Sequence, residues 1–156
     1  MRIIAITDPY DAGSMLAPAL AARGAAAVMV GSTPEVPATE AVSFDPADFA
    51  HLAPWSADIA EPAAALRRLG VERVVAGSER GVELADRLAE ALTLPGNGAS
   101  LSPARRDKLL MSEAAAAQAI RTPRQIASDT LETLLDWIEA EGGWPAVLKP
   151  RRAKGS

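Results

Sequence analysis

Short apolar runs alternate with helical stripes in the first part of the chain. Residues 2–7 and 26–30 are runs of isoleucine, valine and alanine, which are typical of buried strands. The segment 15–22 between them predicts a helix that begins after Ser14 as its cap and ends at Gly24. A strand, a helix and a second strand in this order indicate the opening of a parallel α/β sheet.

Prolines interrupt the pattern between residues 34 and 54, where we predict a short strand at 41–44. The alternation then resumes with a helix at 58–69, a strand at 72–76 and a helix at 80–92. The last of these helices carries apolar side chains on one face, at Val82, Ala85, Leu88, Ala89 and Leu92.

A cluster of turn-forming residues at 94–100 predicts a domain boundary, with an α/β domain at 1–94 and a second region at 95–156. In the second region, Ser102 and Pro103 predict the start of a long helix that ends near Ile120. We then expect a strand at 124–127, a helix capped by Asp129 and a strand at 145–148. Two glycines at 142 and 143 end that helix.

Composition narrows the classes of function. Hydrophobic residues make up 49% of the chain and charged residues 23%, a globular balance. The formal net charge of −4 argues against a nucleic-acid-binding module. The absence of cysteine excludes disulfides and thiolate chemistry, and the single histidine, His51, excludes a His–His metal site within these residues. No apolar run is long enough to span a membrane, so we expect a soluble cytoplasmic protein.

Two candidate loops follow strands of the predicted sheet. Residues 8–14 and 77–81 lie where ligands bind in open α/β sheets, at the carboxyl ends of strands. The first loop lacks the GxGxxG fingerprint, and an ordinary strand-to-helix turn explains it equally well. In the second, Ser78 or Glu79 either caps the next helix or contacts a substrate.

Two further candidates are cationic. Arg105, Arg106 and Lys108 lie early in the predicted helix, where cations are unfavourable against the helix dipole unless an anion is bound or Asp107 pairs with them. Residues 149–156 place Lys149 at the end of an apolar strand, before further cations and a Gly-Ser pair. This is either a phosphate cradle or a charged tail.

The ordered combination resembles the ATP-grasp ligases. Residues 106–111 (RDKLLM), on a helix followed by a short strand, are similar to the first diagnostic stretch of that family. Residues 144–150 (WPAVLKP) are similar to the second. The segments 8–13 (DPYDAG), 16–18, 76–86 (AGSERGVELAD) and 94–98 (LPGNG) resemble the branch that contains L-amino acid ligases and natural-product peptide ligases.

This resemblance implies a Rossmann-like parallel sheet, the pre-ATP-grasp domain, followed by the start of an ATP-grasp domain. It implies that Lys108 and Lys149 contact the phosphates of ATP, and that Gly155 and Ser156 begin a mobile loop over the triphosphate. Ser78 and Glu79 would lie near the substrate. The Mg²⁺ that accompanies ATP would be held by residues outside this chain, and no catalytic residue is assigned within it.

The implied reaction is ATP-dependent. A carboxylate becomes an acyl phosphate, and an amine then displaces phosphate to form an amide, with release of ADP and phosphate. The expected substrates are small amino acids or peptides. The resemblance stops at the start of the phosphate loop, so we expect this segment alone to be inactive and to dimerise through an open sheet edge. The alternatives are a free-standing, non-catalytic α/β binding module and an unrelated dinucleotide-binding domain.

Overall fold

The computed structural model of the protein describes residues 1–36 and 38–152. The chain divides into two compact units, Met1–Ser102 and Pro103–Ser156. Each unit is described by itself.

Unit 1 is built on a four-stranded sheet in the order β3-β2-β1-β4. Its strands are β1 (Arg2–Thr7), β2 (Ala25–Val30), β3 (His51–Ala53) and β4 (Arg73–Ala76). Every neighbouring pair is parallel, with Thr7 opposite Val30 on one side and opposite Ala76 on the other. The α/β fold class predicted from the sequence is confirmed, and all four carboxyl ends face the same edge.

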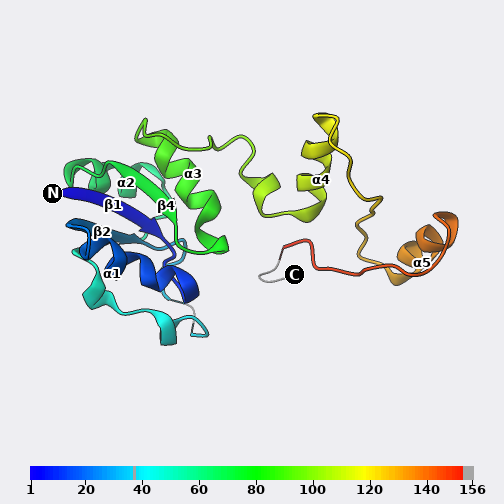
Figure 1. Cartoon of the computed structure of the whole chain (residues 1–156), viewed down its shortest axis with the longest axis horizontal. Coiled ribbons are helices and arrows are strands. Elements are labelled where there is room, and N and C mark those ends of the chain that lie inside the picture. The colour runs from blue at the N-terminus through cyan, green and yellow to red at the C-terminus, as the bar shows by residue number, and fades with distance from the viewer. Residues whose placement is uncertain (37, 153–156) are drawn as a thin grey trace. The chain divides into compact units, whose positions relative to one another are not determined.

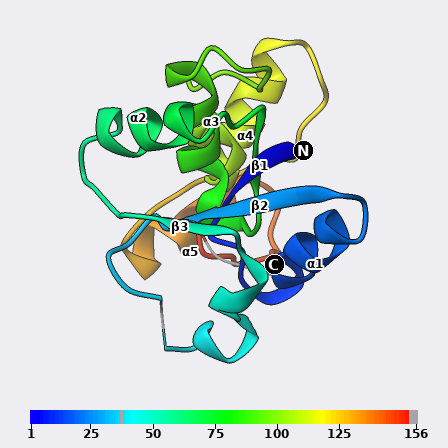
Figure 2. The same cartoon turned by 90° about the vertical axis from the view of Figure 1, so that its left-hand side faces the viewer.

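Helices cover both faces of this sheet (Figures 1 and 2). Helices α2 (Ala60–Arg68) and α3 (Val82–Ala91) cover one face, and α1 (Leu16–Ala21) covers the other. Successive residues of β1 serve the two cores, because side chains alternate along a strand. Ala5 packs with Leu66 and Leu88 in the first core, and Ile6 packs with Ala17 in the second. Ala85, Leu88 and Ala89, on the predicted apolar face of α3, are buried.

Three glycines bring loops onto the carboxyl ends of β1 and β4. A Cβ on Gly81 would clash with Thr7, one on Gly77 would clash with Pro9, and one on Gly13 would clash with Gly77. The Thr7 hydroxyl donates to the Gly81 carbonyl oxygen at 2.8 Å. This close backbone packing fixes where the residues after β1 and β4 lie.

The described part of unit 2 contains a 3-10 turn, Pro103–Arg105, and two α-helices, α4 (Lys108–Ala117) and α5 (Leu131–Ala140), which are joined by irregular chain. No residue of either helix is buried. The segment between them contacts both: Gln125 Nε2 donates to the Leu109 carbonyl oxygen at 3.3 Å, and Arg124 pairs with Glu141 just after α5. Gly142 and Gly143, both with positive φ, end α5 as predicted.

The compact unit 1 extends beyond residue 94. Leu94 packs against its core, and the Ser102 hydroxyl donates to the buried Asp86 carboxylate. The assignment of 1–94 and 95–156 to separate functional domains stays a prediction.

Two details of unit 1 differ from the sequence-based expectation. Ser14 does not cap the helix: a 3-10 turn, Asp11–Met15, precedes α1, and the Ser14 hydroxyl donates to the Asp11 carbonyl oxygen within it. The strand expected at 41–44 is also wrong. Ala41–Ser43 forms a 3-10 turn, and the strand beside β2 is His51–Ala53, whose polar first residue and short length hid it.

Three details of unit 2 differ as well. The long helix expected from Ser102 is interrupted, because Asp107 has an extended backbone and begins α4 anew. Thr130, and not Asp129, is the N-cap of α5. The segments 124–127 and 145–148 form no strand. A strand needs a neighbour that pairs with its backbone, and neither segment has one within the described residues.

Candidate functional site

Asp8 lies at the carboxyl end of β1 and is fully buried. Its backbone has a left-handed φ of 46°, which aspartate tolerates better than most residues and which turns the chain sharply after the strand. One carboxylate oxygen, Oδ1, accepts a hydrogen bond from the Ser32 backbone N–H at 2.8 Å, at the end of β2. The other, Oδ2, is buried and has no hydrogen-bond partner among the described residues.

Tyr10 follows two residues later and is 1% exposed. Its ring packs edge-on against Phe44, with centroids 5.8 Å apart, in the core beneath α1. Its hydroxyl is buried without a hydrogen-bond partner among the described residues. Burial of an unpaired hydroxyl lowers the stability of the folded state. A hydrogen-bond partner for this group must therefore come from outside the described residues.

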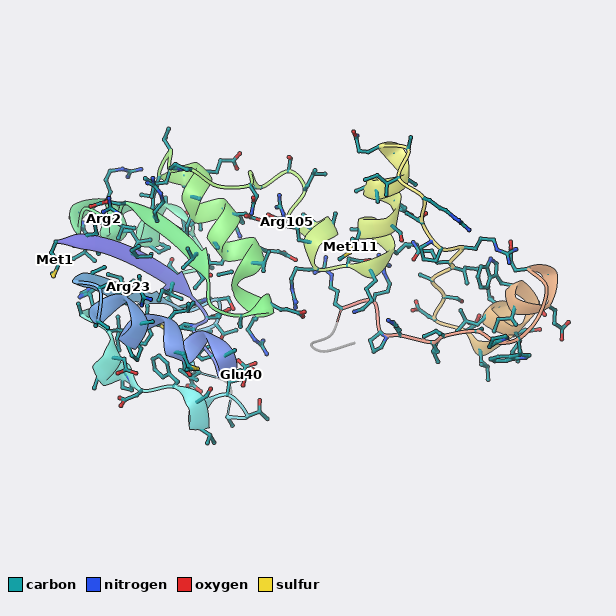
Figure 3. The ribbon with its side chains drawn as sticks, viewed as in Figure 1. Met1, Arg2, Arg23, Glu40, Arg105 and Met111 are labelled. Carbon is teal, nitrogen blue, oxygen red and sulfur yellow. The ribbon has the colours of Figure 1, made fainter. Side chains whose placement is uncertain are left out.

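The segment between β2 and β3 brings Glu40 to the same edge. The Asp11 backbone N–H donates to Ser43 Oγ at 2.8 Å, and the Ser43 hydroxyl donates to the Glu40 carbonyl oxygen at 2.9 Å. Glu40, labelled in Figure 3, is 4% exposed, and Arg80 Nε lies 3.6 Å from its Oε2. Arg80 comes from the loop after β4, so three loops contribute to the cluster.

The electrostatics show that these groups act on one another. Burial raises the pKa of Asp8, opposed by hydrogen bonds from Ser32 and by the charge of Arg80, while the charge of Glu40 raises it further. Burial also raises the pKa of Tyr10 to about 12, and the charges of Asp8 and Glu40 add to that effect. The phenol is therefore neutral near pH 7. Asp8, Tyr10, Glu40 and Arg80 form one cluster, the polar edge cluster.

The structure places Ser78 and Glu79 just after β4. Gly77 N donates to the Thr7 carbonyl oxygen at 2.7 Å, which holds this loop against the end of β1. Ser78 is the N-cap residue of a 3-10 turn, Glu79–Gly81, but makes no side-chain cap hydrogen bond. Capping therefore does not explain Ser78. Its Oγ is buried without a hydrogen-bond partner among the described residues, and Glu79 is exposed.

In unit 2 the structure brings the two lysine motifs together. Lys108 is the first residue of α4, and its backbone N–H donates to the Arg151 carbonyl oxygen at 3.1 Å. Asp107, the residue before it, is 4% exposed. Arg151 Nη2 lies 2.7 Å from Asp107 Oδ2, and Arg151 Nε donates to Asp107 Oδ1 at 3.2 Å. The chain just after Lys149 is thus fastened to the start of α4.

Asp107 also caps α4, because its Oδ1 accepts from the backbone N–H groups of Leu109 at 3.0 Å and Leu110 at 3.3 Å. Burial raises the pKa of Asp107, but the hydrogen bonds from Arg151, Leu110 and Leu109 and the arginine charge outweigh it. The pKa therefore lies below its ordinary value. Arg152 Nε lies 3.7 Å from the same carboxylate.

These contacts show which cations near α4 are already paired with a carboxylate. Arg151 and Arg152 pair with Asp107, and that carboxylate also takes two of the first N–H groups of the helix. An anion here would therefore be held chiefly by the ammonium groups of Lys108, which is half-buried, and Lys149, which is exposed. Gly155 and Ser156, the other predicted phosphate-loop residues, lie outside the described residues.

Sequence reasoning marked the segments that contain Tyr10 and Arg151 but gave neither residue a role, and it missed Glu40. Asp8 and Tyr10 lie in a loop that the sequence did mark as a candidate. The pattern could not show whether their polar atoms are buried or belong to an ordinary turn. Glu40 lies in the proline-rich stretch where no periodicity is present. Arg151 had a usable signal: it follows Lys149 closely, and Asp107 offers an opposite charge directly before Lys108.

The described residues contain no group of three histidine, cysteine, aspartate or glutamate side chains placed to hold a metal ion. No helix in the described part of the chain combines the length and the apolarity needed to cross a membrane.

The chain is similar to known ligases in sequence and in fold. It is 32% identical over 161 residues to dapdiamide A synthase of Enterobacter agglomerans, across 99% of this chain and 37% of that protein. It resembles the L-amino acid ligase of Bacillus licheniformis, with a TM-score of 0.58 and 14% identity over 92% of this chain and 43% of that chain.

A second solved structure, the phosphoribosylglycinamide synthetase of Anaerococcus prevotii, has a TM-score of 0.55 at 14% identity, over 89% of this chain and 34% of that chain. No model of a known protein family matches the chain. The chain thus spans less than half the length of each of these three relatives.

Proposed function

We propose that the protein is an ATP-dependent carboxylate–amine ligase and that this chain supplies part of its nucleotide site. The sequence similarity to dapdiamide A synthase and the similarity in fold to an L-amino acid ligase support this proposal. The observation that carries the proposal for these residues is the contact between the Lys108 N–H and the Arg151 carbonyl oxygen, which joins the two lysine motifs within unit 2.

The proposed role of both lysines is electrostatic. ATP brings the phosphoryl group that activates the carboxylate, and Lys108 and Lys149 would hold its phosphate oxygens. Charge that shifts onto those oxygens during transfer is stabilised by fixed cations nearby. Asp107 and Arg151 would keep the two lysines on one side of the nucleotide. Gly155 and Ser156 are proposed to continue this phosphate loop.

The overall reaction has two steps. A carboxylate oxygen bonds to the γ-phosphorus while the bond to the ADP oxygen breaks. An amine nitrogen then bonds to the acyl carbon, the bond to the phosphate oxygen breaks and the nitrogen gives up a proton. The products are an amide, ADP and phosphate. Amino acids or small peptides are the proposed substrates, Ser78 and Glu79 the proposed substrate-side residues, and Mg²⁺ the proposed companion of ATP.

Product analysis tests this proposal. The full-length protein that contains this chain is incubated with ATP, Mg²⁺ and mixtures of amino acids, and the nucleotide products are separated. We expect ADP and phosphate in amounts equal to the new amide. Release of AMP and pyrophosphate would overturn the proposal, and so would binding of an amine with no nucleotide turnover, which is the behaviour of a non-catalytic binding module.

A binding measurement tests the lysine roles. Lys108→Ala and Lys149→Ala are each expected to weaken ATP binding by about tenfold or more, because each removes a charge-assisted contact. Arg87→Ala, an exposed cation on α3, is the matched control and should leave binding unchanged. ATP binding that is equal in all three variants contradicts the assignment.

A further inference from the structure

The polar edge cluster has more hydrogen-bonding capacity than the described residues use. Within it, Asp8 Oδ2 and the Tyr10 hydroxyl are buried with no hydrogen-bond partner among the described residues, and the same holds for Ser78 Oγ, in the loop that carries Arg80. Asp8 is fully buried and Tyr10 is 1% exposed, so these are not surface groups that bulk water reaches freely. The charge of Asp8 acts on Tyr10, so these two groups lie near each other. Native proteins seldom leave such buried polar atoms unpaired, which indicates that something binds here.

The charges limit what can bind. Two carboxylates, Asp8 and Glu40, lie in the cluster with one cation, Arg80, 3.6 Å from Glu40. An anion would face two carboxylates and only one arginine, so the charge of the cluster disfavours an anionic ligand. No group of three metal-ligating side chains exists among the described residues, which argues against a divalent ion. A positively charged group with its own N–H donors fits the set that remains.

We infer that the polar edge cluster binds a primary ammonium group, with Asp8 Oδ2 and the Tyr10 hydroxyl as acceptors and Ser78 Oγ at its margin. An ammonium offers three N–H donors and no acceptor, so it pairs with several oxygens at once. The neutral phenol accepts one hydrogen bond and keeps its proton for another acceptor. In relation to the proposed function, on which this step rests, the ligand would be the amine or amino-acid substrate.

The contacts of Asp8 orient its carboxylate for binding an ammonium group. Its Oδ1 is already held by the Ser32 N–H, which fixes the direction of Oδ2. The burial that raises its pKa is offset when a cation binds, because the bound charge favours the ionised carboxylate. A carboxylate that costs stability in the free protein and gains a partner on binding is typical of functional sites.

The test is an NMR titration of the whole chain with two small probes in the absence of ATP. L-alaninamide carries an ammonium and no carboxylate, whereas N-acetyl-L-alanine carries a carboxylate and no ammonium. We expect L-alaninamide at millimolar concentration to shift the Ser32 amide signal in a saturable way, and N-acetyl-L-alanine to leave it in place. Equal shifts with both probes, or no shift with either, overturn the inference.

Variants separate binding from folding. Tyr10→Phe keeps the ring against Phe44 and removes only the unpaired hydroxyl, so the protein should fold normally while L-alaninamide binds several-fold more weakly. Asp8→Asn keeps an acceptor for the Ser32 N–H and should weaken binding by about tenfold to a hundredfold. Asp48→Asn, an exposed aspartate in the same unit, should bind as the unchanged protein does.

Two results would show that the unpaired atoms bind only water: tight L-alaninamide binding in Asp8→Asn, or no loss of binding in Tyr10→Phe. The inference and the proposed function fail separately. ADP release that is normal in a protein that binds neither probe overturns the ammonium site alone. Ammonium binding in a protein that releases no ADP overturns the ligase and leaves the site.

Discussion

Arg151 grips Asp107 at two points, with Nη2 2.7 Å from Oδ2 and Nε 3.2 Å from Oδ1, across 44 positions of sequence. The same carboxylate caps α4 through Leu109 and Leu110. The Asp107 side chain therefore has two roles: it caps the helix that begins with Lys108, and it binds the segment that follows Lys149.

Substitution of Asp107 should separate these roles. Asp107→Asn keeps an oxygen that can cap α4 but loses the charge that pairs with Arg151, so we expect α4 to persist while residues 149–152 are released. Asp107→Ala should lose both. Hydrogen exchange of the amides of Lys108, Leu109 and Leu110 measures the outcome. Asp136→Ala, on the exposed surface of α5, is the control, and equal exchange in all variants would contradict the assignment.

Acid should release the same contact. The pKa of Asp107 is lower in the folded chain than in the unfolded chain, so its stabilisation is complete above the unfolded value of about 3.9 and is lost as the pH falls through the folded value. We expect the exchange protection of the Lys108 amide to fall in that acid window. In Asp107→Asn the protection should show no such step, and a step that persists there must come from another group.

The pH dependence of Asp8 should have the opposite sign. Its pKa is raised in the folded chain, so in the window above about 3.9 the folded state holds a proton that the unfolded state has released. Stability therefore falls as the pH rises through that window. Asp8→Asn should lack this slope and be more stable than the unchanged protein near pH 7. Urea unfolding at a series of pH values, followed through amide signals of β1, measures it.

Gly81 should not tolerate a side chain. A Cβ there clashes with both the backbone and the hydroxyl of Thr7, so Gly81→Ala is expected to destabilise unit 1 by about 1–3 kcal/mol. Gly24→Ala is the control. Gly24 has open space around it and a φ of 72°, so only backbone strain of about 1 kcal/mol is expected. Urea unfolding compares the two, and a Gly81 variant as stable as the Gly24 variant would contradict the close packing.

Leu66 tests the core between the sheet and α2. Its side chain is fully buried and packs with Ala5, Val28 and Leu88, so Leu66→Ala should cost about 2–5 kcal/mol. Leu101, which is 57% exposed, supplies the control: Leu101→Ala should change stability by less than about 0.5 kcal/mol. Similar losses from the two substitutions would show that Leu66 does not anchor the core.

The sequence predicted the sheet of unit 1 well where hydrophobicity carries the signal. The central strands β1 and β2 are mostly apolar and covered on both faces, and continuous apolar runs reveal such strands. The edge strand β4 is more exposed, but its Val-Val-Ala run gives the same signal. β3 escaped notice because it is short and only Ala53 is buried in it. In unit 2, residues 145–148 have the composition of a strand, but composition does not supply the neighbouring backbone that a strand requires.

The candidate sites were also predictable only where residues lie in a recognisable sequence pattern. Lys108 and Lys149 lie in ordered motifs that a reader can recognise, and their relation through Asp107 and Arg151 follows from opposite charges. Hydrogen bonds from Asp11 to Ser43 and from Ser43 to the Glu40 carbonyl oxygen hold the loop that carries Glu40 at the polar edge cluster. That contact depends on the path of an irregular loop, which no periodic pattern describes.

The glycines at 13, 77 and 81 separate two roles within unit 1: the backbone sets the course of the loops, and the polar side chains are available for binding. They fix the course of the loops through close contacts with backbone atoms and with the Thr7 hydroxyl, and not with side chains of the polar edge cluster. The hydroxyls of Tyr10 and Ser78 have no hydrogen-bond partner among the described residues, so their removal should leave the course of these loops unchanged. In a protein built this way, ligand specificity can change during evolution while the backbone architecture stays the same.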